Sequence, residues 1–275
     1  MGIINTLNVN ILDQIIEFKR KEVAERKVLY PISLLEQAPN FALPVISLKA
    51  SLLRDDKTGI IAEIKRKSPS KGVINANVSI ERISKGYVDA GASALSILTD
   101  KEFFGGSNED LITARKFNSC PILRKEFIID EYQIIEAKSI GADAILLIAA
   151  VLSPEEVKQF TNLAHSLGLE VLMEVHDETE LKKNVSAGVD LIGANNRDLK
   201  TFTLSIETSK RLANLIPADV IKISESGIES PEAIMELKRY GFKGFLMGQT
   251  FMQNSHPEIA AMKFVTKLKK MESGK

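Results

Sequence analysis

The sequence predicts an α/β protein in which strands and helices alternate along the whole chain. One pattern recurs: a helical stretch ends at a glycine, and a short apolar run begins within a few residues. The pattern occurs at Gly91, Gly141, Gly168, Gly188 and Gly241. A glycine in the left-handed conformation commonly ends a helix, and a short loop then leads into the next strand. The steps of 50, 27, 20 and 53 residues between these glycines indicate a repeat of about 25 residues, with two repeats in each of the long steps.

Eight mostly apolar runs supply the strands of this repeat: 60–65, 94–99, 121–127, 144–150, 170–176, 191–195, 220–225 and 244–249. Continuous apolar runs are typical of parallel strands that are covered on both faces. Eight alternating units predict a (β/α)8 barrel, or TIM barrel, over residues 60–275. A doubly wound open sheet is the alternative, but the Gly-rich turn that often follows the first strand of such a sheet is missing after 60–65.

Helix starts lie between the strand candidates. The segment Ser153-Pro-Glu-Glu combines a serine N-cap, a proline at the first helical position and a glutamate at the third. Asp177 and Ser230 begin similar segments. Residues 1–59 precede the first strand and carry apolar residues at helical spacing, so we expect one or two helices that cap the barrel. No polar linker divides the chain, and residues 1–275 are predicted to form a single domain.

Composition excludes several classes of protein. The 36 Lys and Arg balance 36 Asp and Glu, whereas a nucleic-acid-binding protein usually has a basic excess. No apolar run approaches the roughly 18 residues of a membrane span, and the N-terminus has no basic residue before Lys19, unlike a signal peptide. The single cysteine, Cys120, rules out an internal disulfide. We therefore expect a cytoplasmic protein that binds neither nucleic acid nor membrane.

In a (β/α)8 barrel the chemistry lies at the carboxyl ends of the strands. Glu63 and Lys65 share one face of the first strand, because side chains alternate, and burying them is costly unless they are paired or used. A structural ion pair is the alternative. The loop 66–72 that follows contains hydroxyls, cations and a glycine, which suits a phosphate, although a solvated loop would look similar.

Strands 121–127 and 170–176 each carry one inward-facing charge. Lys125 lies between two apolar neighbours, where desolvation would lower its pKa and make it a candidate general acid or Schiff-base amine. A lysine whose ammonium reaches out to solvent is the alternative. Glu174 is a candidate general base. For His176, on the same face, a hydrogen-bonded position at the rim is at least as good an interpretation as catalysis. The three histidines form no metal-binding motif, so no metal site is expected.

The last three strands end in polar residues. Asn195 and Arg197 share a face, and arginine can bind an oxyanion with two parallel hydrogen bonds. Glu225 and Ser226 end the seventh strand, and the loops after the seventh and eighth strands hold a phosphate in many barrels. Gly227 and Gly248 would allow a ligand to approach the backbone closely.

Taken in order, these motifs resemble those of the indole-3-glycerol phosphate synthase family, and the resemblance covers essentially the whole chain. The matching stretches are 63–72, 94–100, 103–107, 123–130, 173–177, 195–199, 224–228 and 245–248. One position departs from the family, in which the third-strand motif usually reads Lys-Asp-Phe, whereas this chain has Glu126 after Lys125. Because Glu126 faces away from Lys125 by alternation, we expect activity to survive.

The resemblance implies the reaction. The substrate would be 1-(2-carboxyphenylamino)-1-deoxyribulose 5-phosphate, which closes onto its ketone carbon, loses CO2 and water, and becomes indole-3-glycerol phosphate. The family uses no metal and no organic cofactor. The expected partner is this phosphorylated small molecule, and the chain is expected to be a monomer or a weak homodimer.

The resemblance also implies roles. Lys125 would be the general acid of ring closure, Glu174 would act in the dehydration, Glu63 would support proton transfer, and Lys65 would bind the anthranilate carboxylate. Lys65 could also donate the proton, so the resemblance does not decide which of the two lysines is the general acid. Asn195, Arg197 and Glu225 would hold the substrate's polar groups. The apolar walls would be Phe104, Phe127 and Leu146, and the phosphate cup would comprise Ser68, Ser226, Gly227, Gly248 and Gln249.

Three other functions fit the fold class. A sugar isomerase of the same barrel type would need a Cys and an Asp where this chain has Glu63 and Glu174. A Schiff-base aldolase would use an inward lysine such as Lys125 and would be trapped by borohydride. A non-catalytic binding module should have lost the charged residues of the mouth, and this chain retains them.

Overall fold

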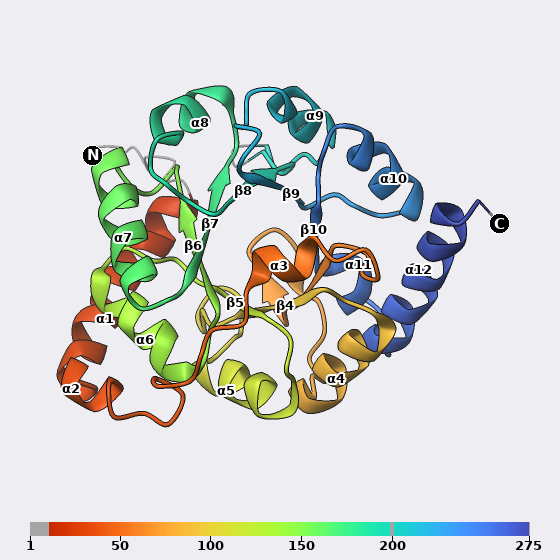
Figure 1. The fold of residues 1–275 in the computed structure, drawn as a ribbon. Helices are drawn as coiled ribbons and strands as arrows, with labels where there is room; N and C mark the ends of the chain where they lie inside the picture. The colour runs from red at the N-terminus through yellow and green to blue at the C-terminus, as the bar shows by residue number, and fades with distance from the viewer. Residues whose placement is uncertain (1–10, 199–200, 275) are drawn as a thin grey trace, which may run out of the picture.

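A computed structural model describes residues 11–198 and 201–274. Eight parallel strands close into a barrel in which β1 pairs with both β4 and β10 (Figure 1). The barrel strands are β1 (Ile60–Ile64), β4 (Ala94–Leu98), β5 (Ile122–Lys125), β6 (Ala144–Ile148), β7 (Glu170–Val175), β8 (Leu191–Asn195), β9 (Ile221–Glu225) and β10 (Gly244–Met247). Each lies within one of the eight predicted runs, so the predicted (β/α)8 barrel is confirmed.

Helices surround the barrel, and all but the last two of them connect successive strands (Figure 1). They are α4 (Ile80–Ala90), α5 (Asn108–Phe117), α6 (Glu131–Ile140), α7 (Pro154–Ser166), α8 (Glu178–Asn184), α9 (Glu207–Ala213), α10 (Pro231–Arg239), the short α11 (Gln249–Met252) and α12 (Pro257–Glu272). The five glycines of the sequence pattern all have positive φ angles. The capping box expected at Ser153 is present, because Ser153 and Glu156 each accept a hydrogen bond from the other's backbone N–H.

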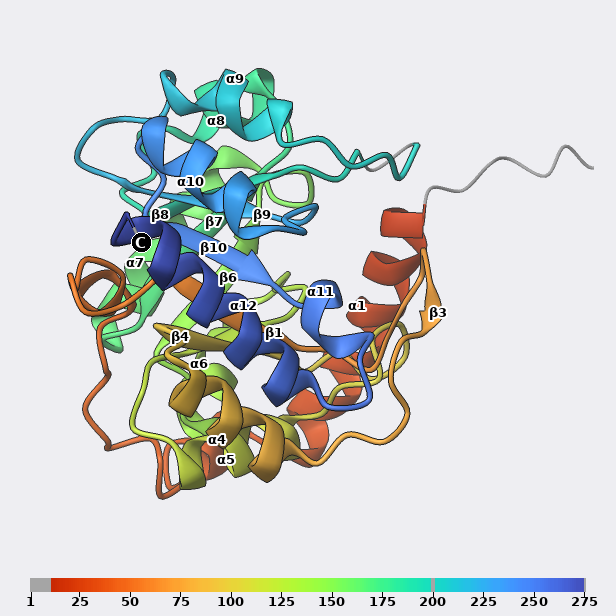
Figure 2. The same cartoon turned by 90° about the vertical axis from the view of Figure 1, so that its right-hand side faces the viewer.

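The N-terminal extension contains three helices in its described part, one more than the sequence predicted: α1 (Ile11–Leu29), α2 (Ile32–Leu35) and α3 (Leu48–Leu52). Figure 2 shows α1 on the right, the side toward which the barrel strands point, and Figure 1 shows α3 across the centre of the opposite end. The extension therefore contacts both ends of the barrel. Within the described ranges, no helix is long and apolar enough to cross a membrane.

Helix α3 closes the amino-terminal end of the barrel. Leu48 and Leu52 are buried among the apolar side chains of the interior, including Ile61. The backbone N–H of Ile46 donates a 2.7 Å hydrogen bond to Asp143, and the Ser47 hydroxyl donates to Glu170. Two acidic residues at the starts of neighbouring strands thus hold this segment against the barrel.

Strand alternation divides the barrel residues between two apolar clusters. One cluster lies outside, between strands and helices, and the other fills the lower interior. The inward positions near the carboxyl ends are charged instead: Glu63, Lys125, Glu174 and Glu225. The apolar floor keeps these four charges away from the water at the other end of the barrel.

The segment after β1 is more ordered than the loop predicted from the sequence. It forms an antiparallel hairpin of β2 (Lys67–Ser68) and β3 (Gly72–Val73), which Figure 2 shows beside α1. Arg66 anchors its base by pairing with Asp110 at the start of α5. The hairpin brings Ser68 over the mouth of the barrel.

Candidate active site

A cavity of about 570 Å³ opens at the carboxyl ends of the barrel strands. All fifteen site residues proposed from the sequence line it: Glu63, Lys65, Ser68, Phe104, Lys125, Phe127, Leu146, Glu174, Asn195, Arg197, Glu225, Ser226, Gly227, Gly248 and Gln249. Helix α1 adds Ile11, Leu12 and Ile15, which sequence reasoning did not assign to the site. The N-terminal cap is therefore part of the cavity wall.

Lys125 lies at the centre of a cluster of carboxylates. Its Nζ is 2.8 Å from Glu174 Oε2 and 3.2 Å from Glu225 Oε2. Burial acts to lower the pKa of Lys125, but Glu174, Glu225 and Glu63 outweigh burial and hold the pKa above its ordinary value. The expectation of a lowered pKa was wrong, because the carboxylates of three other strands converge on this lysine only when the barrel closes.

Lys65 forms the second ion pair of the mouth. Its Nζ is 2.6 Å from Glu63 Oε1, and the lysine is more exposed than its buried partner. The shared face predicted from strand alternation is therefore confirmed, and the two side chains also form the ion pair that was given as the alternative. Lys65 and Lys125 thus line one cavity, and each is paired with a different carboxylate.

His176 connects Glu174 to the start of α8. Its Nε2 is 3.3 Å from Glu174 Oε1, and its Nδ1 is 3.1 Å from Glu180 Oε2. Burial acts to lower the pKa of His176, but Glu174 and Glu180 outweigh it and raise the pKa to about 10. Burial likewise acts to raise the pKa of Glu174, yet Lys125 and His176 hold it well below its ordinary value. His176 is thus a protonated neighbour that keeps Glu174 ionised.

Glu225 has a different environment from Glu174. Burial, reinforced by Glu174 and Glu63, raises the pKa of Glu225 to about 7 although Lys125 opposes the shift. Its Oε1 is buried and has no hydrogen-bond partner within the described residues. Two carboxylates on one lysine thus have opposite protonation tendencies at neutral pH, which is a common arrangement for acid–base chemistry.

Two inward-facing glycines create the space for the buried carboxylates. A Cβ atom at Gly193 on β8 would lie 2.0 Å from Glu225 Oε1, and one at Gly248 would lie 2.6 Å from Glu63 Oε1. The sequence indicated Gly248 as a position for a close phosphate approach and did not single out Gly193. A side chain at either position would therefore force the neighbouring carboxylate to move from its present place.

The remaining predicted residues form two further regions. The Phe104 and Phe127 rings lie 5.8 Å apart, and Leu146 lies in the barrel interior. At the end of β9, Ser226 and Gly227 have φ angles of 67° and 69°. A left-handed serine is strained, and such strain is common at functional sites. Asn196, which was not predicted, donates a 3.0 Å hydrogen bond to the Ser226 carbonyl and so supports this turn.

Asn195 and Arg197 follow β8 on the same side of the mouth. The Asn195 side-chain oxygen accepts a 3.0 Å hydrogen bond from the Arg197 backbone N–H. Burial lowers the pKa of the Arg197 guanidinium. The Asn195 carboxamide and the Arg197 guanidinium thus line the same side of the cavity, as their spacing predicted.

Comparisons with known proteins agree on one family. A family model described as indole-3-glycerol phosphate synthase matches residues 12–264. A protein of that name from Bacteroides thetaiotaomicron is 48% identical over 256 residues, which are 93% of this chain and 98% of that protein. Another from Caldanaerobacter subterraneus is 44% identical, over 94% of this chain and 99% of that protein.

A solved structure shows the same fold at low sequence identity. It is titled "Native KDPGal structure" and aligns with a TM-score of 0.56 and 15% identity, over 78% of this chain and 94% of that one. At this identity the likeness concerns the barrel architecture alone.

Proposed function

Since the chain belongs to the indole-3-glycerol phosphate synthase family, we propose that its cavity converts 1-(2-carboxyphenylamino)-1-deoxyribulose 5-phosphate to indole-3-glycerol phosphate, CO2 and water. This is the carboxy-lyase step of tryptophan biosynthesis. The observation that carries the assignment of roles is the position of Lys125, buried between Glu174 and Glu225 in a cavity that also holds Lys65.

Lys125 is proposed as the general acid of ring closure. As the aryl carbon attacks the ketone, the carbonyl oxygen gains negative charge and needs a proton. The Lys125 ammonium is buried and charged, and displacement of a carboxylate by the substrate would lower its pKa toward the range of an acid. Lys65 is proposed to bind the anthranilate carboxylate.

Glu174 is proposed to act as the base of the later dehydration. The Lys125 and His176 cations keep Glu174 ionised in the free protein. Transfer of the Lys125 proton to the substrate would remove one of these cations, raise the pKa of Glu174 and make it a better base. Glu63 is proposed to orient Lys65, to which it is bonded. Asn195, Arg197 and Glu225 are proposed to hold the polar groups of the substrate.

The anthranilate ring and the phosphate are proposed to occupy opposite sides of the cavity. The ring would lie against Phe104, Phe127 and Leu146, which supply apolar contact area. The phosphate would lie on the other side, at the loops after β9 and β10 that hold phosphate in many barrels. The phosphate cup would comprise Ser68, Ser226, Gly227, Gly248 and Gln249.

A fluorescence assay tests the function directly. The chain contains no tryptophan, so the indole of the product should be visible against a weak protein background. Purified protein and the substrate are expected to produce indole emission, accompanied by CO2 release. A folded protein that yields neither signal would refute the proposed activity, and borohydride trapping of the substrate on Lys125 would instead favour an aldolase.

The pH dependence tests the assignment of Glu225. Ionisation of Glu225 through about pH 7 adds negative charge beside an anionic substrate. We therefore expect KM to rise as the pH increases from 6 to 8, and Glu225→Gln to flatten this rise because the amide does not ionise. Steady-state kinetics across this range provide the measurement. An identical rise in the variant would show that another group titrates.

The protein is proposed to act in the cytoplasm as a monomer or a weak homodimer. Its one cysteine, Cys120, is unpaired, which fits a reducing compartment.

A further inference from the structure

Lys19 is a buried cation on the inner face of α1. Its side chain is only 2% exposed and has three acidic partners. The ammonium lies 2.5 Å from Glu22 on the same helix, 3.0 Å from Asp100 Oδ2 and 3.0 Å from Glu126 Oε1. Burial acts to lower the pKa of Lys19, but Glu126, Asp100 and Glu22 hold it above its ordinary value. The lysine therefore remains charged inside the protein.

Asp100, the first barrel partner of Lys19, organises the turn after β4. Its Oδ1 accepts hydrogen bonds from the backbone N–H groups of Phe103 at 2.7 Å and Phe104 at 3.0 Å. The position of Phe104, one of the two aromatic walls, therefore depends on where this carboxylate is held. The other oxygen, Oδ2, is the one that Lys19 contacts.

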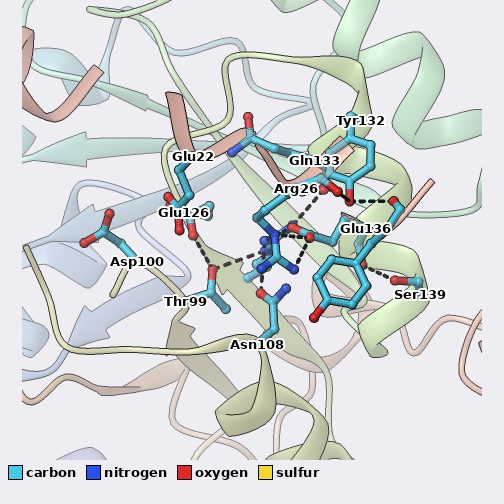
Figure 3. Close-up of polar contacts among 12 residues, drawn as sticks. Glu22, Arg26, Thr99, Asp100, Asn108, Glu126, Tyr132, Gln133, Glu136 and Ser139 are labelled. Carbon is cyan, nitrogen blue, oxygen red and sulfur yellow. Dashed lines mark hydrogen bonds and ion pairs between the residues drawn. The ribbon is translucent and has the colours of Figure 1, made fainter. Parts of the chain in front are cut away.

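Glu126, the second barrel partner, organises the turn after β5. Its Oε2 accepts a 2.6 Å hydrogen bond from the Thr99 hydroxyl, and its Oε1 accepts a 2.9 Å bond from the Phe127 backbone N–H. Figure 3 shows the bond between Thr99 and Glu126, with Asp100 and Glu22 beside them. Glu126 is thus fixed next to Lys125, and it holds the turn that carries the second aromatic wall.

One ammonium from α1 therefore joins the two turns that carry Phe104 and Phe127. We propose that Lys19 is a positioning residue: it holds Asp100 and Glu126 together and so sets the gap in which the aromatic ring of the substrate binds. The proposal rests on the proposed function, because it assigns the two rings to substrate binding. It also assigns a contact to Glu126, which stands where the family usually has aspartate. That contact is the ion pair with Lys19.

Docking of the helix is the competing explanation, and Arg26 allows it to be tested. Arg26 anchors the same helix through Glu136 on α6, with Nη2 2.5 Å from Oε1, and Figure 3 shows this pair. Glu136 in turn binds Arg124 on the outer face of β5. Loss of Arg26 would weaken the attachment of α1 without removing the link between Asp100 and Glu126.

The experiment compares Lys19→Met with Arg26→Met by steady-state kinetics on the carboxyphenylamino-deoxyribulose phosphate. If Lys19 positions the aromatic walls, Lys19→Met should raise KM by roughly tenfold or more and change kcat by less than about threefold. Arg26→Met should move KM by less than about threefold. Lys21→Met, which removes an exposed lysine from the same helix, should leave both constants unchanged.

Restoring the charge balance provides an independent readout. Lys19→Arg should retain a KM near that of the wild type, because it keeps a cation between the two carboxylates. Adding Glu126→Gln to Lys19→Met should recover part of the lost affinity, since one unpaired buried charge is removed. A merely structural lysine would give no such recovery.

Each outcome separates this proposal from the proposed function. An inactive wild type would refute the function, whereas an active wild type with an unchanged KM in folded Lys19→Met would refute only the positioning role. Equal KM increases in Lys19→Met and Arg26→Met would show that helix docking is sufficient and would also refute it. If Lys19→Met does not fold, Glu126→Gln tests the same contact: a raised KM with kcat retained supports the role, and an unchanged KM overturns it.

Discussion

Lys125→Ala is expected to lower kcat by about 10²–10⁴-fold, the usual contribution of a general acid. The folded structure should survive, because the change leaves Glu174 with His176 as a remaining cationic neighbour. Circular dichroism and the fluorescence assay together provide the measurement. Near-normal turnover in a folded variant would remove Lys125 from the acid role.

Lys65→Ala is the matched control, since it removes a second lysine from the same cavity. If Lys65 binds the substrate carboxylate, this variant should raise KM more than it lowers kcat. The reverse result, a large loss of kcat in Lys65→Ala and a small loss in Lys125→Ala, would make Lys65 the decisive acid. The pair of variants thus answers the question that the sequence left open.

Asp143→Ala is expected to lower the free energy of unfolding by about 3–5 kcal/mol. The carboxylate accepts 2.7 Å hydrogen bonds from the backbone N–H groups of Ile46 and Ile122 and pairs with Arg115. Burial holds the pKa of Asp143 above its ordinary value in spite of Arg115, so the ion pair alone gives little stability. The loss comes from two unsatisfied N–H groups and from Arg115, which would lose its carboxylate and keep only backbone carbonyl acceptors.

Chemical denaturation measures this loss, with Asp56→Ala as the control. Asp56 pairs with Arg54 on the surface, where the same substitution should barely move the unfolding midpoint. Asp143 lies at the closed end of the barrel, so the residual folded population of Asp143→Ala should keep its KM. A midpoint shift no larger than that of Asp56→Ala would show that Asp143 does not hold the extension.

Local patterns predicted most of the fold. The apolar runs marked the barrel strands because buried parallel strands cannot carry alternating polar residues. Gly91 and Gly141 marked helix ends because the left-handed conformation is costly for other residues. The inward directions of Lys125 and Glu174 followed from strand alternation, which depends on nothing outside the strand. The hairpin at 67–73 was missed because its strands are only two residues long.

Properties that depend on several segments at once could not be predicted. The pKa of Lys125 was expected to fall because its own strand is apolar, yet Glu174 and Glu225 from distant strands reverse the direction. Lys19 was seen only as the first basic residue of the chain, because the helical pattern does not reveal which turn it meets. For the same reason, the sequence does not reveal that Gly193 lies against Glu225 on the neighbouring strand.

The two inward glycines impose a constraint on engineering. Replacing glycine with alanine is a common way to stabilise a protein, but at positions 193 and 248 the added methyl group would collide with Glu225 or Glu63. In a library of variants selected for growth without tryptophan, Gly193 should therefore tolerate as little change as Lys125, although its hydrogen side chain performs no chemistry. The tolerance to mutation, taken alone, would therefore classify Gly193 as a catalytic residue. Stabilising designs for this barrel should leave both glycines in place.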